Sequence, residues 1–529
     1  MKLISHLLWR RALASLLAAS LALSFPALAQ VRLPALGESA SDDLSVAAER
    51  RLGEQIMREG RRDPAYLDDP VLLEYLQQLW KPLVVAARAR GDINAETDQA
   101  FSWEAFLVRD RSVNAFALPG GYVGVHLGLI AITSSADQLA SVLAHELTHV
   151  TQRHIARSIA PQQRASMVAL ASILLAVLAA SRNPDAANAT MMGGQAAAAQ
   201  GQLNFSRDME READRVGFGL LGEAGYSTSG MASMFERLDQ ATRLNDNSSF
   251  PYLRSHPLTV DRIAEARNRT LLSGASAPVP TLQHALMQAR SRVLMDDSAQ
   301  SLLRFNGSTA SALPLDRAAA AYAGSLAASL LNDPARAETL AADALREAQA
   351  AAPREALAER AIHLLQAQIR LTRGDAAGAL RVLDGLASRS NERAPLLMRA
   401  QTLLALHRSA PSERTGALRE STEQLQTWVS EHASDALAWD LLAGTADALG
   451  LKLRSMRAAA EARVVVGDLS GGIDRLRAAQ HMSRGATGQD FIEASVIDAR
   501  LRQVTAQRRA LQLEARESRG GRNGPDELP

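Results

Sequence analysis

The segment Ser141–Val150 constrains the fold most, because it places two histidines and a glutamate in one predicted helix. Apolar residues flank them at steps of three and four, which is the period of an amphipathic helix. His145 and His149 are four residues apart and therefore share one helical face, where a single tetrahedral metal ion can bind both imidazoles. Glu146 lies next to the first of them. The segment therefore predicts a metal site built on a helix.

The spacing is that of the H-E-x-x-H pattern, in which two neutral imidazoles hold zinc and the glutamate acts as a general base. Catalytic zinc takes a third protein ligand as well. Glu210 and Asp214 offer one, since they lie four residues apart in a charged helical segment. We predict that Glu210 binds zinc, and that Asp214 accepts a ring N–H of a ligand histidine or donates a proton. The alternative is an ordinary solvated face.

The two motifs in this order resemble a family of gluzincin peptidases that includes the CAAX prenyl proteases, the HtpX proteases and the periplasmic BepA-type proteases. The resemblance covers roughly residues 40–275 and is strongest to the BepA type. It implies that His145, His149 and Glu210 bind zinc, that Glu146 is the catalytic base, and that Asp214 is a second functional carboxylate. Three further motifs support it: Asn114-Ala-Phe-Ala, Thr151-Gln-Arg-His154 and Ser255-His-Pro257.

The resemblance also implies a function. It indicates a zinc endopeptidase that acts on unfolded or stalled outer-membrane proteins and docks on the outer-membrane assembly machinery through a repeat domain. A chaperone or adaptor with a latent zinc site is the main alternative, although such a protein has no need of the base Glu146. A membrane-embedded prenyl-protein protease is a second alternative, and it requires several spanning segments.

The composition narrows the class of protein. A chain of 529 residues is too long for one hydrophobic core, so two or three domains are expected. It has no cysteine, which excludes disulfides, thiol catalysis and thiolate zinc sites. Lys and Arg number 58 against 57 Asp and Glu, so no nucleic acid is expected as a partner.

Residues 1–29 have the three parts of a secretory signal: a basic start, an apolar core and a small-x-small cleavage site. We expect cleavage between Ala29 and Gln30 and export to the periplasm. The alternative is an uncleaved membrane anchor, but the apolar core Ala12–Phe25 is short for a membrane span.

The expected fold is mainly α with a small β-sheet (α+β). We predict a zincin-like metalloprotease domain over residues 30–275, a linker and first connecting helix over 276–315, and helix pairs resembling tetratricopeptide repeats over 316–510. Such a solenoid offers a long surface for a protein partner, and a purely structural bundle is the alternative. The charged, Gly- and Pro-containing tail 511–529 is expected to be disordered.

The residues before the motif helix predict strands. Ser102–Arg109 is one, and residues 113–126 form two more around Pro119-Gly120-Gly121. The hairpin could pair with an extended substrate or be purely structural. We expect His126 to be a packed or surface residue rather than a ligand.

Two other segments have open interpretations. Residues 165–205 form an apolar and then polar insertion, which we expect to be a flap beside the site rather than a stable transmembrane segment. His256 lies in a loop and is a possible fourth or regulatory zinc ligand. Its alternatives are to cap a helix or to stabilise the transition state.

Overall fold

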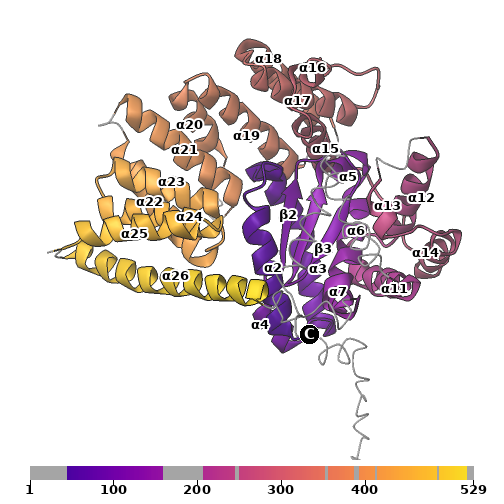
Figure 1. The fold of residues 1–529 in the computed structure, drawn as a ribbon. Coiled ribbons are helices and arrows are strands. Elements are labelled where there is room, and N and C mark those ends of the chain that lie inside the picture. Colours follow the sequence, from indigo (N-terminus) through magenta and orange to yellow (C-terminus); the bar gives the residue numbers. More distant parts are fainter. Residues whose placement is uncertain are drawn as a thin grey trace, which may run out of the picture. The chain divides into compact units, whose positions relative to one another are not determined.

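The computed structural model of the protein describes residues 44–158, 206–244, 250–351, 355–386, 392–410, 414–484 and 488–520. Helices dominate these residues, and one four-stranded sheet lies among them (Figure 1), which confirms the predicted mainly α fold. The signal segment 1–29 and the whole insertion 165–205 lie outside the described residues. Within the described ranges, none of the helices has both the length and the apolar character that a membrane span requires.

The sheet has the strand order β1-β2-β4-β3. The predicted hairpin is present, because β3 and β4 pair antiparallel around a turn in which Gly120 and Gly121 have φ of 77° and 88°. Glycine tolerates this left-handed backbone because it has no Cβ. The parallel pairing of β2 with β4 was not predicted. The strands are β1 (Tyr66–Leu67), β2 (Glu104–Val108), β3 (Ala115–Leu118) and β4 (Tyr122–His126).

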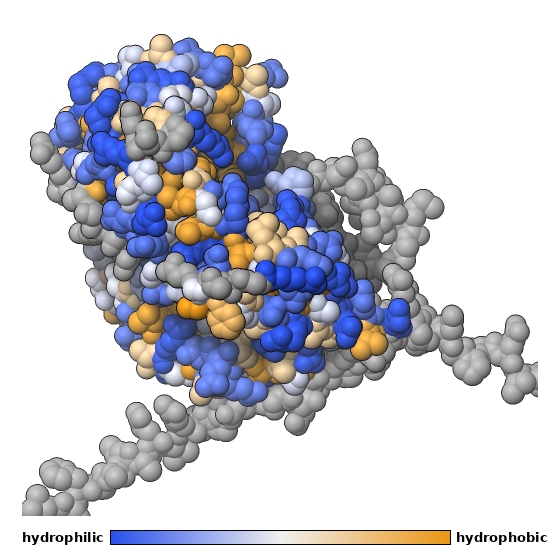
Figure 2. Space-filling model, turned by 90° about the vertical axis from the view of Figure 1, so that its left-hand side faces the viewer, coloured by the Kyte–Doolittle hydropathy of each residue, from blue (hydrophilic) through white to orange (hydrophobic). Residues whose placement is uncertain are grey.

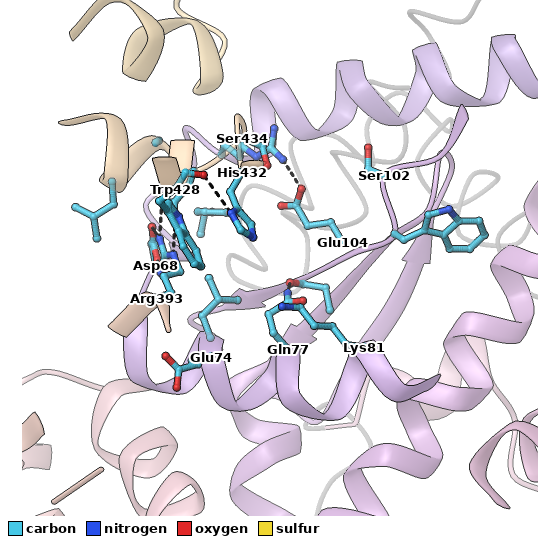
Figure 3. A pocket seen from close by; sticks show the side chains of 18 of the residues that line it. Asp68, Glu74, Gln77, Lys81, Ser102, Glu104, Arg393, Trp428, His432 and Ser434 are labelled. Atoms are coloured by element: carbon cyan, nitrogen blue, oxygen red, sulfur yellow. Dashed lines mark hydrogen bonds and ion pairs between the residues drawn. The ribbon is translucent and has the colours of Figure 1, made fainter. Parts of the chain in front are cut away.

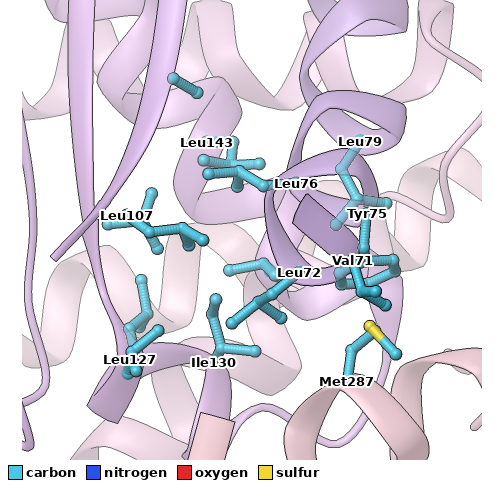
Figure 4. Packing of buried hydrophobic residues seen from close by; sticks show 14 of the residues in the cluster. Val71, Leu72, Tyr75, Leu76, Leu79, Leu107, Leu127, Ile130, Leu143 and Met287 are labelled. Carbon is cyan, nitrogen blue, oxygen red and sulfur yellow. The ribbon is translucent and has the colours of Figure 1, made fainter. Parts of the chain in front are cut away.

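Helix α3 (Pro70–Arg90) organises the core beside the sheet. It packs on both β2 and α6 (Ala136–Thr151), the helix of the histidine motif. Figure 4 shows the leucines of these elements side by side, and Leu72, Leu107 and Leu143 are completely buried. Each buried leucine contributes about 1.5–3 kcal/mol relative to an exposed one. The core therefore holds α6 rigidly. The neighbouring helices are α2 (Val46–Gly60), α4 (Ala95–Ala100), α5 (Leu127–Ile132) and α7 (His154–Ser158).

In the described part of the chain, the next helices lie between residues 207 and 273, and the first of them carries the carboxylate motif. The first of them, α11, packs directly on α6, and so does the second, α12. They are α11 (Arg207–Glu223), α12 (Ser229–Leu244), α13 (Tyr252–Ser255) and α14 (Val260–Ser273).

The remaining described residues are mostly helical, as predicted, and most successive helices pack as neighbours. On the face that Figure 2 shows, hydrophilic residues surround small groups of hydrophobic ones. The helices are α15 (Leu282–Leu294), α16 (Ala299–Leu302), α17 (Pro314–Leu330), α18 (Pro334–Ala350), α19 (Ala356–Thr372), α20 (Ala376–Gly385), α21 (Arg393–Ser409), α22 (Thr415–Glu431), α23 (Ala436–Ala448), α24 (Lys452–Val465), α25 (Leu469–Met482) and α26 (Gln489–Gly520).

One expectation for the C-terminus was wrong. Helix α26 continues to Gly520, so residues 511–520 are helical where composition predicted disorder. Leu511 packs against the buried cluster that includes Ile497 and Val504, and this contact extends the helix past the boundary that charge content indicated. Residues 521–529 lie outside the described residues.

The start of α3 is tied to the later helices by buried or half-buried ion pairs. Three carboxylates on or just before α3 each meet an arginine from a different helix of the C-terminal region. The pairs are Asp69 with Arg290 of α15, Glu74 with Arg360 of α19, and Asp68 with Arg393 of α21.

A cavity of about 660 Å³ lies beside these ion pairs (Figure 3). Gln77 and Lys81 of α3 and Glu104 of β2 line one side, and Trp428 and His432 of the later helices line the other. The rings of Trp428 and His432 are stacked, with centroids 3.9 Å apart. Helix α3, strand β2 and the later helices therefore meet around a cavity with an aromatic wall.

Arg290 offers a test of this packing. Its guanidinium is buried and donates to both carboxylate oxygens of Asp69 at 2.7 and 2.6 Å and to Tyr322 at 2.9 Å. We expect Arg290→Met to destabilise the protein by about 3–5 kcal/mol in urea unfolding, because it leaves a largely buried carboxylate without its counter-charge. The control Arg346→Met removes an exposed pair with Asp343 and should change stability by less than about 1 kcal/mol. Equal effects would contradict the interpretation.

Candidate metal centre

Helix α6 presents the motif from inside the core. It begins at the cap Ser135, whose side chain accepts from the backbone N–H of Gln138. Every residue from Gln138 to Val150 is buried, so the helix has no solvated face in this stretch. Burial of its apolar residues fixes the direction in which His145, Glu146 and His149 point.

Helix α11 brings the predicted carboxylates to α6. Ser206 caps its N-terminus, and Glu210 and Asp214 are both buried, although they are charged. Gly217 permits the close approach of the two helices, since a Cβ there would lie 3.3 Å from the backbone of Ala144. A side chain there would require the neighbouring backbone of α6 to move by a few tenths of an ångström.

The structure brings the four predicted metal-binding side chains together. One potential ligand atom from each of His145, His149, Glu210 and His256 lies within 4.8 Å of the others, and all four residues are buried. The Nε2 atoms of His145 and His149 are 3.0 Å apart, and each lies 3.5 Å from a carboxylate oxygen of Glu210. The sequence-predicted ligand set thus converges on one point.

The donor set fits zinc. Two imidazoles and a carboxylate are ligands that zinc uses in catalytic sites, where one position stays open for substrate or water. Glu146 is fully buried, yet neither of its carboxylate oxygens accepts a hydrogen bond from the described residues. A buried carboxylate without a donor is costly. A cation and a water at this place would satisfy it.

Asp214 supports the first of the histidines. Its Oδ1 lies 3.1 Å from Nδ1 of His145, and Arg262 donates to both of its oxygens at 2.7 and 2.8 Å. Burial raises the pKa of Asp214, but the hydrogen bonds from Arg262 and His145 outweigh it and lower the pKa overall. A carboxylate that stays ionised favours the role of acceptor over that of proton donor.

The pKa values of the two α6 histidines move in opposite directions. Burial lowers the pKa of His145, but hydrogen bonds to Asp214 and Glu210 raise it to about 9. The pKa of His149 is lowered by burial and then by the neighbouring His145. The pKa of Glu210 is lowered because the charges of His256 and His145 outweigh its burial. The difference between the histidines arises because only His145 faces Asp214.

His256 reaches the cluster from the end of α13. It occupies the C-cap position, where its backbone N–H donates to the carbonyl of Tyr252. Its Nδ1 lies 2.9 Å from Oε1 of Glu210 and 3.3 Å from Nε2 of His145, and its Nε2 lies 3.5 Å from Oε1 of Glu146. The side chain therefore touches two predicted ligands and the predicted base.

Sequence reasoning missed several residues at this site. Arg262 binds Asp214 and also lies 2.8 Å from Glu210, while the buried ring of Tyr252 stacks on His256 with centroids 4.7 Å apart. Neither belongs to a spacing pattern, so no local signal in the sequence identified them. His126 is buried and hydrogen-bonds Ser112 outside the cluster, in agreement with a packed role.

The fold and the site define a class. A buried helix with two histidines and a glutamate, supported by a small sheet and met by a carboxylate from a second helix, is the arrangement of zincin-like metallopeptidases. Residues 74–270 match the family described as peptidase family M48. This match supports a metal cofactor at the site.

Several curated relatives are similar to this chain. A putative beta-barrel assembly-enhancing protease of Vibrio cholerae is 40% identical over 272 residues, which is 50% of this chain and 53% of the relative. The beta-barrel assembly-enhancing protease of Escherichia coli K12 is 35% identical over 237 residues, 45% of this chain and 47% of the relative. The mitochondrial metalloendopeptidase OMA1 of Schizosaccharomyces pombe is 29% identical over 228 residues, which is 42% of this chain and 61% of the relative. The chain spans about half the length of the two bacterial relatives.

The contact between Asp214 and His145 leads to a prediction about metal affinity. We expect Asp214→Asn to weaken zinc binding about 10- to 100-fold, because an amide is a poorer acceptor for the ring N–H of the ligand. Competition with a chelator of known affinity measures this. Asp208→Asn on the same helix is the matched control, since that side chain is 92% exposed and pairs with Arg211. Unchanged zinc affinity in both variants would contradict the role of Asp214 as the acceptor that supports His145.

Proposed function

We propose that this chain is an exported zinc endopeptidase that hydrolyses peptide bonds of unfolded or misassembled proteins. The convergence of His145, His149 and Glu210 beside Glu146, whose carboxylate accepts no hydrogen bond from the described residues, is the observation that supports it best. Bound zinc would supply a Lewis acid that polarises the scissile carbonyl and activates a water.

The chain's own residues have separate roles in this proposal. Glu146 takes a proton from the attacking water and passes it to the leaving amine, because its oxygens accept no hydrogen bond from the described residues. Asp214 holds the ring of His145, and Arg262 holds Asp214. Arg262 also balances the negative charge of Glu210 at 2.8 Å.

The edge of the sheet suits an extended substrate. β3 ends the strand order and pairs only with β4 among the described strands, and it packs against α6. A peptide can add to such an edge through backbone hydrogen bonds that depend little on sequence. This supports substrate pairing over a purely structural hairpin, and it suits an enzyme that accepts varied unfolded chains.

The substrates we propose are outer-membrane β-barrel proteins during assembly, in the periplasm. The names of the bacterial relatives support this, as does the secretory signal predicted for residues 1–29. We propose that the helix pairs dock on the assembly machinery. The cavity between α3 and the later helices is a candidate place, because it joins the docking region to the helix that packs on α6 (Figure 3).

A chaperone or adaptor with a latent site is the alternative function, and one observation favours latency. His256 contacts Glu210, His145 and Glu146 at once, so it occupies space that substrate and water would need. We propose that His256 is a latch that must move away before catalysis.

The decisive variant for the enzyme is Glu146→Gln. We expect it to lower the rate of cleavage of casein or an unfolded β-barrel protein at least about 100-fold, because the general base is lost. Zinc content should stay the same, since Glu146 is not one of the proposed ligands. Zinc bound by both proteins with no cleavage by either would instead favour the chaperone or adaptor function.

The latch can be tested with His256→Ala. We expect this variant to cleave faster than wild type, because removing the imidazole frees the space beside Glu210 and Glu146. The measurement is the initial rate on an unfolded substrate at equal zinc content. His481→Ala, which changes an exposed histidine of α25, is the control and should leave the rate unchanged. A slower His256→Ala enzyme would show that His256 assists the chemistry instead.

A further inference from the structure

His154 lies directly behind the metal centre. It begins α7, three residues after the end of α6, and its side chain is completely buried. Its Nδ1 is 2.9 Å from Nδ1 of His149. Its other nitrogen, Nε2, is 3.1 Å from Oε2 of Glu212, and Arg157 donates to the same oxygen at 3.1 Å. An imidazole, a carboxylate and a guanidinium thus stand in a row behind one proposed ligand.

The direction of these hydrogen bonds follows from the metal site, so this inference rests on the proposed function. The Nε2 of His149 faces Glu210 and His145, which makes it the atom that binds the metal. An imidazole bound through Nε2 and kept neutral has its proton on Nδ1. Only one proton can lie between two Nδ1 atoms 2.9 Å apart, so Nδ1 of His149 donates and Nδ1 of His154 accepts.

The position of the proton on His154 follows from the position of the proton on His149. Since Nδ1 of His154 accepts, the proton of the neutral ring is on Nε2. That N–H points at Glu212, which is an acceptor. The chain of hydrogen bonds therefore runs in one direction, from His149 to His154 and from His154 to Glu212.

We propose that His154 is a positioning residue that sets the tautomer and the ring orientation of the ligand His149, and that Glu212 sets His154 in turn. His145 has a carboxylate, Asp214, in the corresponding place. The two ligands are thus oriented differently, one by a charged acceptor and the other through a neutral imidazole.

The surrounding backbone holds His154 in place. The residue before it, Arg153, has φ of 52°, a left-handed conformation that is uncommon outside glycine and turns the chain sharply between α6 and α7. Its guanidinium is buried and pairs with Glu49 at 3.0 Å, and it also donates to the carbonyl of Leu44. These contacts fix the turn from which His154 reaches back to His149.

The hydrogen bonds from His149 through His154 to Glu212, which we call the relay, also join two helices that flank residues 159–205. Arg157 belongs to α7 and Glu212 to α11, and they meet at the oxygen that accepts from His154. Glu212 lies two residues from Glu210, so the same helix supplies a proposed ligand and the anchor of the relay. A change in the spacing of α7 and α11 would therefore alter the orientation of His149 through these hydrogen bonds.

Zinc affinity and a spectroscopic readout test the proposal together in the full-length protein. We expect His154→Leu to weaken zinc binding about 10- to 100-fold in chelator competition, because His149 loses its acceptor. His154→Asn should recover most of the affinity, since its Oδ1 can take the place of Nδ1. His481→Leu is the control and should bind zinc like wild type. Thermal unfolding of the metal-free variants measures how far each one folds.

Nitrogen-15 NMR of the histidine rings in the zinc-loaded wild type reads the tautomer directly, so the proposal is testable even if His154→Leu does not fold. We expect His154 to carry its proton on Nε2 and His149 on Nδ1. A proton on Nδ1 of His154, or wild-type zinc affinity in a folded His154→Leu protein, would overturn the inference. Failure of the proposed function looks different, because the wild type itself would then bind no zinc or, with zinc bound, would cleave no unfolded substrate.

Discussion

The site depends on the packing of α11 against α6. Glu210 is useful only if it reaches two imidazoles that another helix presents, and the approach of the helices at Gly217 makes this possible. The arrangement places several charges in the interior, where burial alone is unfavourable. The structure offsets that cost with paired contacts, in which Arg262 holds both Glu210 and Asp214. These paired contacts fix the positions of the side chains in the cluster. A change in any one of these residues should therefore shift the others.

The same helix core connects the site with the rest of the chain. α3 packs on α6 through completely buried leucines, and its N-terminal end meets arginines from α15, α19 and α21. A partner bound near the cavity beside α3 would press on the helix that supports the motif. This gives the helix pairs a physical route to the proposed metal centre.

The sequence predicted the parts of the site that have a local pattern. Two histidines at a spacing of four and the pair Glu210 and Asp214 both follow from helical geometry, and the strands of the hairpin follow from alternation around Gly120 and Gly121. The parallel pairing of β2 with β4 could not be predicted, because it joins strands across an intervening hairpin. Arg262 belongs to the same class, since its importance comes from a contact 48 residues away in the chain.

His256 and His154 are intermediate cases. Short motifs around each of them suggested that they matter, but the motifs could not show which nitrogen faces which neighbour. Those contacts depend on the turn at Arg153 and on the end of α13, where backbone conformation decides the position of the ring. The expectation of disorder in residues 511–520 failed for a similar reason, because it ignored the packing of Leu511.

The central claim is that His145, His149 and Glu210 hold one zinc ion. Diffraction from crystals of the zinc-loaded protein, recorded on both sides of the zinc absorption edge, would locate the ion directly. We predict one anomalous peak, bounded by Nε2 of both histidines and the carboxylate of Glu210, with Glu146 beside it. A peak at another place, or none in protein that contains zinc in solution, would contradict it.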